Sequence, residues 1–471
     1  MINAYDEIAY PPAAFRETHP EVMATYAILF GLPPPVERRR VLEIGAGDGS
    51  NLIPMAMGLP DSHFVGFDLA GEPVRRGNEM IEALGLTNIA LRQANILDID
   101  LGPDPFDYII AHGVYSWVPP ETRDAMMRLV GRSLAPAGVA FVSYNALPGG
   151  YIRLAIRQDL LLSTRGIPGR TARIDAAMRR LQAWPQPSPN QGAFQNAVAE
   201  EVGRMRQRSA AILAHDELSD SYHPVYLDDF AAHCAENGLQ ILGEAAKDVA
   251  DWLLAPDAPA EPPDALLARN QQADFTSARF FRQSLLVGAD LEVRRRPPAG
   301  LIATLHVASG VRRTQGDNFE AEGLRFSLGD PILAGVLERL AAIWPATAPA
   351  DSLGLDEGRV LALLRLHGVG ALELHAAPSR FITAAGDRPM ASPLARLQAR
   401  RGQTRLTTLR HTMRDLEDDF SCSLLASLDG ARTRAEIARD VAPRFNLTPE
   451  GALAPLGVFL DVLAHAPLLV Q

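Results

Sequence analysis

The chain has few cysteines, no long apolar run and fewer positive than negative charges. Its 471 residues include two cysteines, Cys234 and Cys422, without metal-ligand spacing, so we expect no disulfide framework, no zinc site and a reducing, cytoplasmic compartment. No run of about 18 apolar residues occurs and the first ten residues do not resemble a signal peptide, so no membrane span is expected. The net charge of -11 argues against nucleic acid as the main partner.

What is present is typical of a globular protein of several domains. The hydrophobic fraction is 47% and the charged fraction 21%, and the length predicts about three domains. Residues 1–38, rich in proline and aromatic residues, contain a helical pattern from Pro20 to Phe30, which we interpret as part of a lid or cap outside the core. The predicted units that follow are a main domain at 39–295 with a helical insertion at about 154–225, an accessory α+β module at 296–390 and a helical, winged-helix-like module at 391–471.

Strand and helix patterns alternate regularly in the main domain. This alternation predicts a parallel sheet with right-handed crossovers, which is a doubly wound, Rossmann-like α/β fold. The expected strands are 41–44, 64–68, 90–93, 106–110 and 139–143, with 239–242 and 280–287 as candidates for the sixth and seventh, and the expected helices are 72–84, 121–134 and 228–236. Beyond the linker at 294–298 we expect strands at 301–307, 323–327 and 371–374 and helices at 331–343, 356–366, 432–442 and 448–464.

A glycine loop, Glu43 to Gly49, follows the first predicted strand. Glycines at this position let the backbone turn sharply and approach a ligand closely. A dinucleotide site would have glycine or alanine at the position of Ser50, and the carboxylate of Asp48 would repel a diphosphate. The same carboxylate would attract a ligand that carries an ammonium and a sulfonium group. The loop therefore favours S-adenosylmethionine over NAD, and a turn that binds no cofactor is the structural alternative.

Two further strand ends support this cofactor. Asp68 ends the second strand, where a carboxylate can accept hydrogen bonds from both hydroxyls of a ribose. Asn95 and Ile96 end the third strand, where an amide can bond to the exocyclic amine of adenine and an apolar side chain can pack on the ring. We predict that S-adenosylmethionine, converted to S-adenosylhomocysteine, is bound by Glu43, Gly45, Ala46, Gly47, Asp48, Asn51, Asp68, Leu69, Asn95, Ile96 and His112.

At these residues the chain resembles bacterial class I S-adenosylmethionine-dependent methyltransferases that carry a methyltransferase regulatory domain. The likeness includes Tyr5-Asp6-Glu7, Thr18-His19-Pro20, His112-Gly113-Val114-Tyr115-Ser116-Trp117 and Tyr144-Asn145-Ala146-Leu147-Pro148-Gly149. His215-Asp216-Glu217-Leu218 and Phe280-Phe281-Arg282-Gln283 are similar to the regulatory domain, which we place at about 211–295. Because the best-known relatives methylate lysine side chains of outer-membrane proteins, the resemblance implies a lysine acceptor in a protein.

The acceptor is expected beyond the carboxyl ends of the strands, where open sheets bind their ligands. A lysine must lose a proton before it attacks, and an apolar, aromatic channel favours the neutral amine. The candidate catalytic residues at this edge are Tyr144, Asn145, His112, Tyr115 and Trp117, with Tyr5 and Tyr10 in the lid. Tyr115 and Trp117 could equally be local packing, and His112 could offer only its backbone to the cofactor.

Three functions compete at this point. The leading hypothesis is N-methylation of lysine in a protein that the C-terminal modules hold. The first alternative is methylation of a small metabolite or natural product, and the second is a non-catalytic interaction protein that binds the cofactor. The sequence does not predict an oligomeric state. The basic run from Arg400 to Arg414 is interpreted as a solvated helix face or linker.

Overall fold

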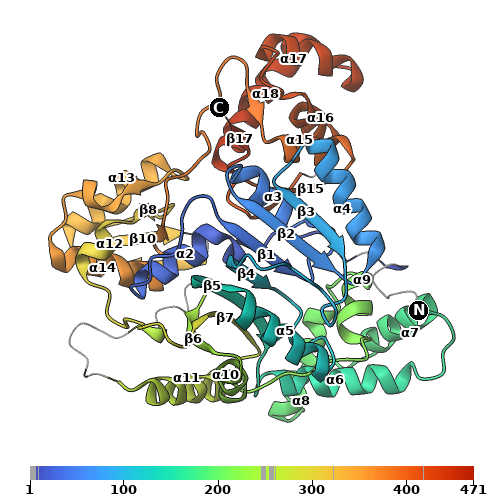
Figure 1. The fold of residues 1–471 in the computed structure, drawn as a ribbon. Helices are drawn as coiled ribbons and strands as arrows, with labels where there is room; N and C mark the ends of the chain where they lie inside the picture. The colour runs from blue at the N-terminus through green and yellow to red at the C-terminus, as the bar shows by residue number, and fades with distance from the viewer. Residues whose placement is uncertain are drawn as a thin grey trace.

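A computed structural model describes residues 7–8, 10–245, 251–253, 259, 261–321, 323–416 and 418–470. At its centre lies a seven-stranded sheet in the order β3-β2-β1-β4-β5-β7-β6 (Figure 1). The first five strands are parallel, while β7 runs antiparallel to both of its neighbours. The strands are β1 (Arg40–Ile44), β2 (His63–Asp68), β3 (Ile89–Gln93), β4 (Phe106–Ala111), β5 (Leu134–Asn145), β6 (Leu239–Glu244) and β7 (Phe281–Gly288). The predicted doubly wound α/β sheet is confirmed, including its sixth and seventh strands.

The helices between the strands cover both faces of the sheet. From β1 the chain crosses to β2 and then to β3, toward one edge of the sheet, whereas from β4 it crosses to β5, toward the other edge. Because the crossovers are right-handed, the helices of the two groups lie on opposite faces. These helices are α3 (Leu52–Gly58), α4 (Gly71–Leu84) and α5 (Pro120–Ser133), and α10 (Leu227–Glu236) covers β5 and β6 beside α5. The carboxyl ends of β1, β2 and β4 therefore meet at one edge of the sheet.

The N-terminal segment contains η1 (Arg16–Thr18) and α2 (Pro20–Leu29). The predicted helix is confirmed, but the expectation that it lies outside the core is wrong. Met23, Ala24 and Leu29 are buried and belong to the same core as the central sheet. Apolar side chains lie all round this helix, so it is packed on both sides, against β5 and against β13 (Glu373–His375) of the accessory module.

Residues 150–217 form a helical unit beside the sheet, at the lower right of Figure 1. Its helices pack around a core of their own that includes Ile156, Leu160 and Val202. The helices are α6 (Gly150–Ser163), α7 (Arg170–Gln182), α8 (Ala193–Met205), α9 (Ala210–Ile212) and the π-helix η2 (Leu213–Glu217). The chain then returns to the main domain, where α11 (Pro263–Ser277) precedes β7.

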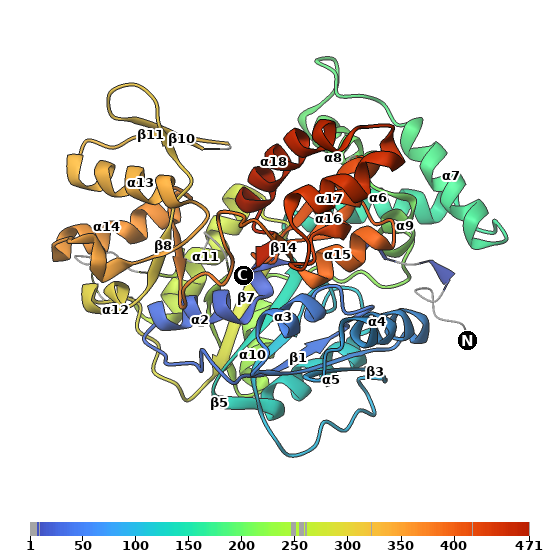
Figure 2. The ribbon, with the colours of Figure 1, turned by 90° about the horizontal axis from the view of Figure 1, so that it is seen from above.

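The accessory module lies beside the sheet, on the side of α2 (Figures 1 and 2). The expected strand at 301–307 is wrong over most of its length, because α12 (Ala299–Ala303) begins after the extended Pro298 and buries Ile302. A short apolar run does not distinguish a strand from one turn of buried helix. The other elements are β8 (His306–Ala308), β9 (Arg312–Arg313), β10 (Asn318–Ala321), β11 (Leu324–Ser327), α13 (Pro331–Ile343), β12 (Ala348–Pro349), η4 (Ala350–Leu353) and α14 (Glu357–Gly368).

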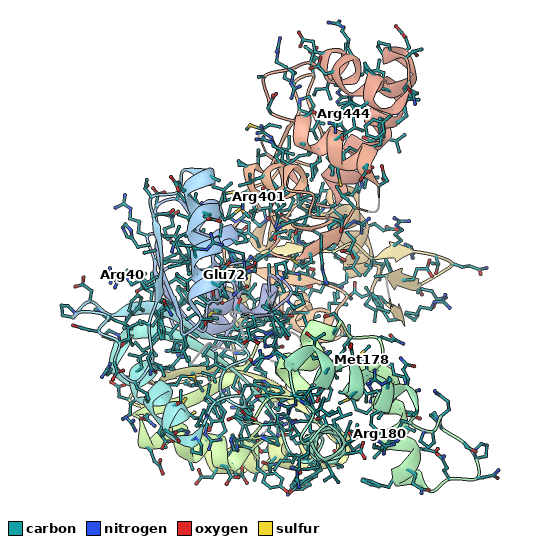
Figure 3. All side chains as sticks on the ribbon, turned by 90° about the vertical axis from the view of Figure 1, so that its right-hand side faces the viewer. Arg40, Glu72, Met178, Arg180, Arg401 and Arg444 are labelled. Carbon is teal, nitrogen blue, oxygen red and sulfur yellow. The ribbon has the colours of Figure 1, made fainter. Side chains whose placement is uncertain are left out.

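The C-terminal module is a set of helices with a hairpin, as a winged-helix fold requires. It packs around Leu406, Leu425 and Leu460 and lies above α3 and α4 (Figure 1). Arg401 reaches α4 from this module, with its Nη1 3.8 Å from Met80 Sδ (Figure 3). The elements are β14 (Met390–Ala391), α15 (Pro393–Arg400), β15 (Arg405–Thr407), β16 (Met413–Asp415), α16 (Asp419–Ser427), α17 (Arg434–Val441), η5 (Ala442–Phe445), α18 (Pro449–His465) and β17 (Leu469–Val470).

The run at 400–414 departs from its interpretation as a solvated face. Arg410 and His411 lie in the turn between β15 and β16, and the turn enters the interior, where His411 is buried. Cys234 and Cys422 are both free. Among the described residues no single helix is long and apolar enough to cross a membrane, although a sharply bent pair, 434–445 with 449–465, meets that test when taken together.

Candidate functional site

The glycine loop leaves β1 with three left-handed residues. The φ angles of Gly45, Gly47 and Gly49 are 72°, 54° and 72°, a region that residues with a Cβ rarely adopt. A Cβ on Gly45 would lie 2.7 Å from Val114 Cγ2, whereas one on Gly47 would meet nothing within 4 Å. The loop is thus closed toward β4 and open at Gly47, where a ligand can approach the backbone.

Asp68, at the end of β2, faces this opening. Its Oδ2 accepts a hydrogen bond from the Gly47 N–H at 2.9 Å, and its Oδ1 accepts one from the Ala70 N–H at 2.8 Å. Leu69 and Leu97 beside it are apolar yet 57% and 51% exposed. A carboxylate flanked by exposed apolar side chains is suited to a ribose and an adjoining flat base.

Asn95 and Ile96 lie at the same edge. Asn95 is exposed, and its Oδ1 accepts a hydrogen bond from the Leu97 N–H at 3.1 Å. Ile96 is half-buried and packs against the core of the main domain. The structure therefore brings together the predicted ribose and adenine residues, and their cofactor contacts remain predictions.

Glu43 lies buried beneath the loop. Its Oε1 accepts a hydrogen bond from Asn51 Nδ2 at 2.7 Å, whereas its buried Oε2 has no hydrogen-bond partner among the described residues. Burial raises the pKa of Glu43 to about 8, so this carboxyl is mostly protonated near neutral pH. A positively charged ligand group above it would favour the ionised form. An orphaned carboxyl oxygen under the glycine loop therefore fits the ammonium group of S-adenosylmethionine.

Asn51, whose role in cofactor binding remains a prediction, connects three parts of the chain. It is only 6% exposed, and its Oδ1 accepts hydrogen bonds from the Phe15 N–H at 2.9 Å and from His411 Nε2 at 2.8 Å. Its Nδ2 donates to Glu43 and, at 3.0 Å, to Thr18 Oγ1. Through Asn51 the N-terminal segment and the C-terminal module both hold the start of α3.

Asp48 lies on the outer side of the loop. Its Oδ1 accepts hydrogen bonds from the backbone N–H and the hydroxyl of Ser50, at 3.1 and 2.5 Å. The residue lines a small cavity together with Arg76 and Arg401, toward the C-terminal module. Its carboxylate thus caps the turn that starts α3, and its attraction for the cofactor remains a prediction.

His112, just after β4, stands in an aromatic wall. Its ring centroid lies 3.9 Å from that of Phe15, 5.8 Å from that of Phe141 and 6.3 Å from that of Phe281. Burial lowers its pKa to about 4, so the ring is neutral near pH 7, and within the described part of the chain its buried Nδ1 has no hydrogen-bond partner. Asn145 pairs in register with Phe281 at the same end of the sheet. His112 and Asn145 therefore lie at one edge, next to the glycine loop.

Tyr144 and Tyr115 lie on the side of β5 that α10 covers. The Tyr144 ring stacks on Phe230 of α10 at 4.1 Å, and the side chain is buried. The Tyr115 hydroxyl is 2.9 Å from His233 Nδ1, also on α10. Successive side chains of a strand point to opposite faces, so Tyr144 and Asn145 are separated by the sheet itself. In this arrangement the two tyrosines pack the interior.

The remaining aromatic candidates lie toward the helical insertion. Trp117 is 4.9 Å from the Tyr222 ring and carries the Arg153 guanidinium over its face, also at 4.9 Å. Tyr10 lies 5.7 Å from the ring of His215. Tyr5 is outside the described residues. The structure does not gather these residues with His112.

Two functional candidates were missed by the sequence reasoning. Phe15 belongs to a recognisable aromatic segment, but no local pattern pairs it with His112, 97 positions later. His411 gives no signal at all, because its partner Asn51 is 360 residues away. Contacts of this kind depend on how the domains assemble.

Comparisons with known families match three segments of the chain. Residues 41–138 match a family described as a methyltransferase domain. Residues 209–288 match a predicted methyltransferase regulatory domain. Residues 387–447 match the PKMT C-terminal winged helix domain. The three matches fall on the central sheet, on the segment from η2 to β7 and on the C-terminal module.

Relatives of known sequence and structure are found in rickettsiae. The uncharacterized protein RP789 of Rickettsia prowazekii is 34% identical over 302 residues, which are 62% of this chain and 54% of RP789, so the chain spans about half the length of that relative. The uncharacterized protein RP028 of the same organism is 31% identical over 51% of this chain and 96% of its own length. PKMT2 from Rickettsia typhi, solved alone and with AdoHcy, has the same fold, with a TM-score of 0.84, 24% identity and coverage of 98% of this chain and 100% of that one.

Proposed function

Because this chain belongs to the class I S-adenosylmethionine-dependent methyltransferases that carry a methyltransferase regulatory domain, we propose that it methylates lysine side chains of a protein. The observation that carries the proposal is the aromatic wall of neutral His112 and Phe15 beside the open glycine loop. The proposal places a donor site and an uncharged acceptor site next to each other at the carboxyl edge of the sheet.

The donor side is formed by residues at the ends of β1 and β2. Asp68 is oriented toward the glycine loop by the N–H groups of Gly47 and Ala70, in the place where a carboxylate binds ribose hydroxyls. Glu43 offers an unpartnered oxygen under the loop, and Gly47 leaves its approach open. When bound, S-adenosylmethionine supplies a methyl group on a sulfonium, and the solved neighbour PKMT2 holds the product AdoHcy.

The acceptor side favours a neutral amine. The ordinary pKa of lysine is about 10.4, and an apolar surrounding lowers it because burial penalises the charged form. Phe15, Phe141 and Phe281 provide that surrounding, and neutral His112 adds no charge. We assign to Asn145 the role of orienting the amine through its amide oxygen. The wall mainly positions the nucleophile and excludes water.

A protein acceptor is supported by the domains outside the sheet. The C-terminal module matches the PKMT winged helix family, and the fold of PKMT2 extends over nearly the whole chain. A small metabolite would leave these modules without a role in substrate recognition. Methylation of such a metabolite, and cofactor binding without catalysis, are the competing outcomes of the test below.

The test compares the natural chain with Asp68→Ala and with Asp61→Ala, an exposed carboxylate just before β2 that serves as a matched control. We expect Asp68→Ala to weaken S-adenosylhomocysteine binding at least about tenfold in calorimetry, since hydrogen bonds to a charged group each contribute about 1.5–3 kcal/mol. Asp61→Ala should bind normally. Unchanged affinity in Asp68→Ala would contradict the assigned cofactor site.

The acceptor is identified with methyl-labelled S-adenosylmethionine and a cell lysate. We expect label in acid-precipitated protein, recovered as methylated lysine after hydrolysis, and its loss in Asp68→Ala. Label confined to the small-molecule fraction would replace the proposal by metabolite methylation. Label in neither fraction, together with intact S-adenosylhomocysteine binding, would favour the non-catalytic alternative.

A further inference from the structure

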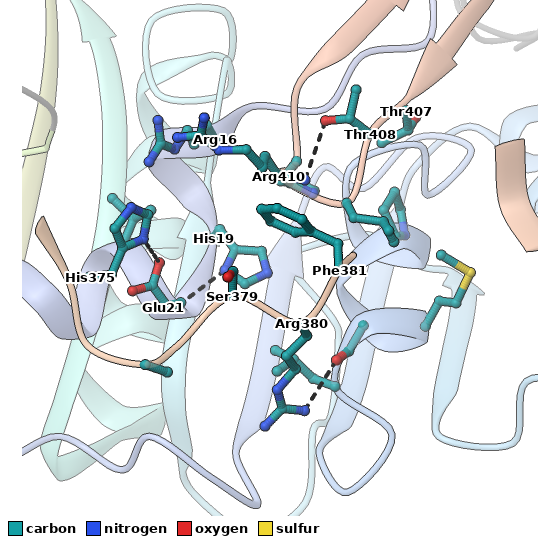
Figure 4. Close-up of a pocket in the computed structure, with 18 of the residues that line it drawn as sticks. Arg16, His19, Glu21, His375, Ser379, Arg380, Phe381, Thr407, Thr408 and Arg410 are labelled. Atoms are coloured by element: carbon teal, nitrogen blue, oxygen red, sulfur yellow. Dashed lines mark hydrogen bonds and ion pairs between the residues drawn. The ribbon is translucent and has the colours of Figure 1, made fainter. Parts of the chain in front are cut away.

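A cavity of about 480 Å³ lies between the N-terminal segment, α3 and the two C-terminal modules (Figure 4). Its wall is formed by residues of the ranges 16–22, 54–59, 375–381 and 407–411, together with Arg39. This volume is in the range of small-molecule sites. Of the described residues around it, neither Asp68 nor His112 belongs to the wall, so the cavity is distinct from the proposed methyl-transfer site.

Positive charge dominates the wall. Arg16, Arg39, Arg380 and Arg410 all line it. Arg16 and Arg410 share the carboxylate of Glu373, the former at 2.8 Å. The lining carboxylate of Glu21 lies 3.5 Å from His375. Burial alone would raise the pKa of Glu21, but its contacts, first of all the one with His375, lower this pKa to about 2. Within the described part of the chain, no carboxylate forms an ion pair with Arg39 or Arg380.

Arg39 is the most unusual of these groups. The residue is 1% exposed, and its Nε and Nη1 have no hydrogen-bond partner in the described structure. The guanidinium lies 5.7 Å from the centroid of the Tyr108 ring. Burial lowers the pKa of Arg39; Tyr108 and the carboxylates of Glu21 and Asp107 oppose this shift, and the charge of Arg380 adds to it. A buried cation whose carboxylate neighbours are not in ion-pair contact is unfavourable, so a ligand that supplies a negative charge in direct contact would be stabilising.

Arg380 stands at the mouth of the same cavity. It is exposed, and its Nη1 donates to the Gly58 carbonyl at 3.4 Å, at the end of α3 (Figure 4). Between the charged groups the wall is apolar, with Met57, Leu59 and Phe381 among its residues. A ligand that fits must therefore combine an anionic group with an apolar body.

We propose that this cavity binds a small organic anion, with its phosphate or carboxylate against Arg39 and Arg380 and its apolar or aromatic body against Met57, Leu59 and Phe381. Guanidinium groups pair with both kinds of anion through paired N–H donors. A lysine side chain is positively charged and does not fit, so the cavity is not the acceptor site. The proposal does not depend on the chain being a lysine methyltransferase.

The experiment measures binding to the full chain by calorimetry and thermal shift. Phenyl phosphate and benzoate serve as probes that separate the two anionic groups, inorganic phosphate tests the need for the apolar body, and benzylamine is a cationic probe of similar size. We expect at least one aromatic anion to bind and to raise the melting temperature, inorganic phosphate to bind more weakly and benzylamine not to bind.

Variants locate the site. Arg380→Gln and Arg39→Met should each weaken binding of the aromatic anion at least about tenfold, as expected for loss of a charge-assisted contact. Because Arg380 is exposed, its variant should fold even where Arg39→Met does not, and normal S-adenosylhomocysteine binding would verify this. Arg365→Gln, exposed on α14, is the matched control and should bind the probe normally.

Three results would overturn the proposal. The first is that neither aromatic anion binds, or that benzylamine binds equally well. The second is undiminished binding of the anion to a folded Arg380→Gln variant. The third is displacement of the anion by saturating S-adenosylhomocysteine, which would place it in the cofactor site. None of these measurements uses methyl transfer, so a failure here is distinguishable from a failure of the proposed function.

Discussion

At the scale of single residues, Glu43 is a carboxyl group that folding removes from water. Its position at the end of β1 is dictated locally, by the strand that precedes the glycine loop. The raised pKa of Glu43 is not dictated locally, because burial beneath the loop and the N-terminal segment removes the carboxyl from solvent. The hydrogen bond from Asn51 opposes this shift but does not cancel it. Glu43 therefore makes stability depend on pH.

We expect Glu43→Gln to change that dependence in a defined direction. Between its ordinary pKa of 4.5 and the raised value of about 8, the folded chain keeps a proton that the unfolded chain loses. The stability contributed by the protonated group is therefore complete below pH 4.5 and falls as the pH rises to about 8. Glutamine is neutral throughout, so the variant should be more stable than the natural chain by a few kcal/mol at pH 9.

Urea unfolding at pH 6, 7.5 and 9 measures this difference. Glu82→Gln, on the exposed side of α4, is the control and should follow the natural chain at each pH. A constant offset between Glu43→Gln and the natural chain across the range would show that the carboxyl is already ionised in the folded state.

At the scale of elements, a buried arginine joins β7 to β6 and α11. Arg282 is buried and bonds to both oxygens of Asp274 at 2.8 Å and to Glu244 Oε1 at 2.8 Å. The Ser284 hydroxyl and the Gln283 N–H satisfy Glu244 further, each at 2.7 Å. This network holds β7 between β5 and β6, and thus fixes the aromatic wall through Phe281.

We expect Arg282→Met to lower the free energy of unfolding by about 3–5 kcal/mol. The substitution leaves the buried carboxylates of Asp274 and Glu244 without their shared cation, and breaking one side of a buried ion network has this cost. Arg269→Met on α11 removes an exposed pair with Glu261 and should cost at most about 1 kcal/mol. Chemical denaturation of both variants provides the measurement, and equal losses would contradict the assigned network.

At the scale of the whole molecule, the carboxylate of Glu373 joins the N-terminal segment, the accessory module and the C-terminal module. Arg16 forms two hydrogen bonds to it, at 2.8 and 2.9 Å, and Arg410 and His375 bond to it as well. His411, the residue after Arg410, bonds to Asn51, which in turn bonds to Glu43 beneath the glycine loop. The C-terminal module is therefore connected to the proposed cofactor site by a continuous set of polar contacts.

Glu373→Gln should loosen this junction. The neutral amide leaves Arg16 and Arg410 without a counter-charge, so we expect a loss of about 3 kcal/mol or more in unfolding free energy. Hydrogen exchange should become faster in the turn at 407–412 and at the start of α3. Glu338→Gln, which removes a partly exposed pair with Arg313, is the control and should leave exchange in these segments unchanged. Unaltered exchange in Glu373→Gln would show that the modules are held together elsewhere.

Much of this organisation could be predicted from the sequence because it depends on local patterns. The alternation of strands and helices, the left-handed glycines and the placement of Asp68 at a strand end follow from neighbours within about 30 residues. The helix predicted from Pro20 to Phe30 follows for the same reason. That it lies in the core depends on the accessory module, whose β13 covers it from 344 residues beyond its end.

Tertiary structure alone decided which residues share a site. Strand alternation places Tyr144 and Asn145 on opposite faces, but only the packing of α10 shows that the tyrosine face is closed. No local pattern brings His411 to Asn51 or gathers Arg39 and Arg380 around one cavity. Burial and charge compensation depend on every segment that surrounds a side chain, whereas periodicity depends only on the segment that contains it.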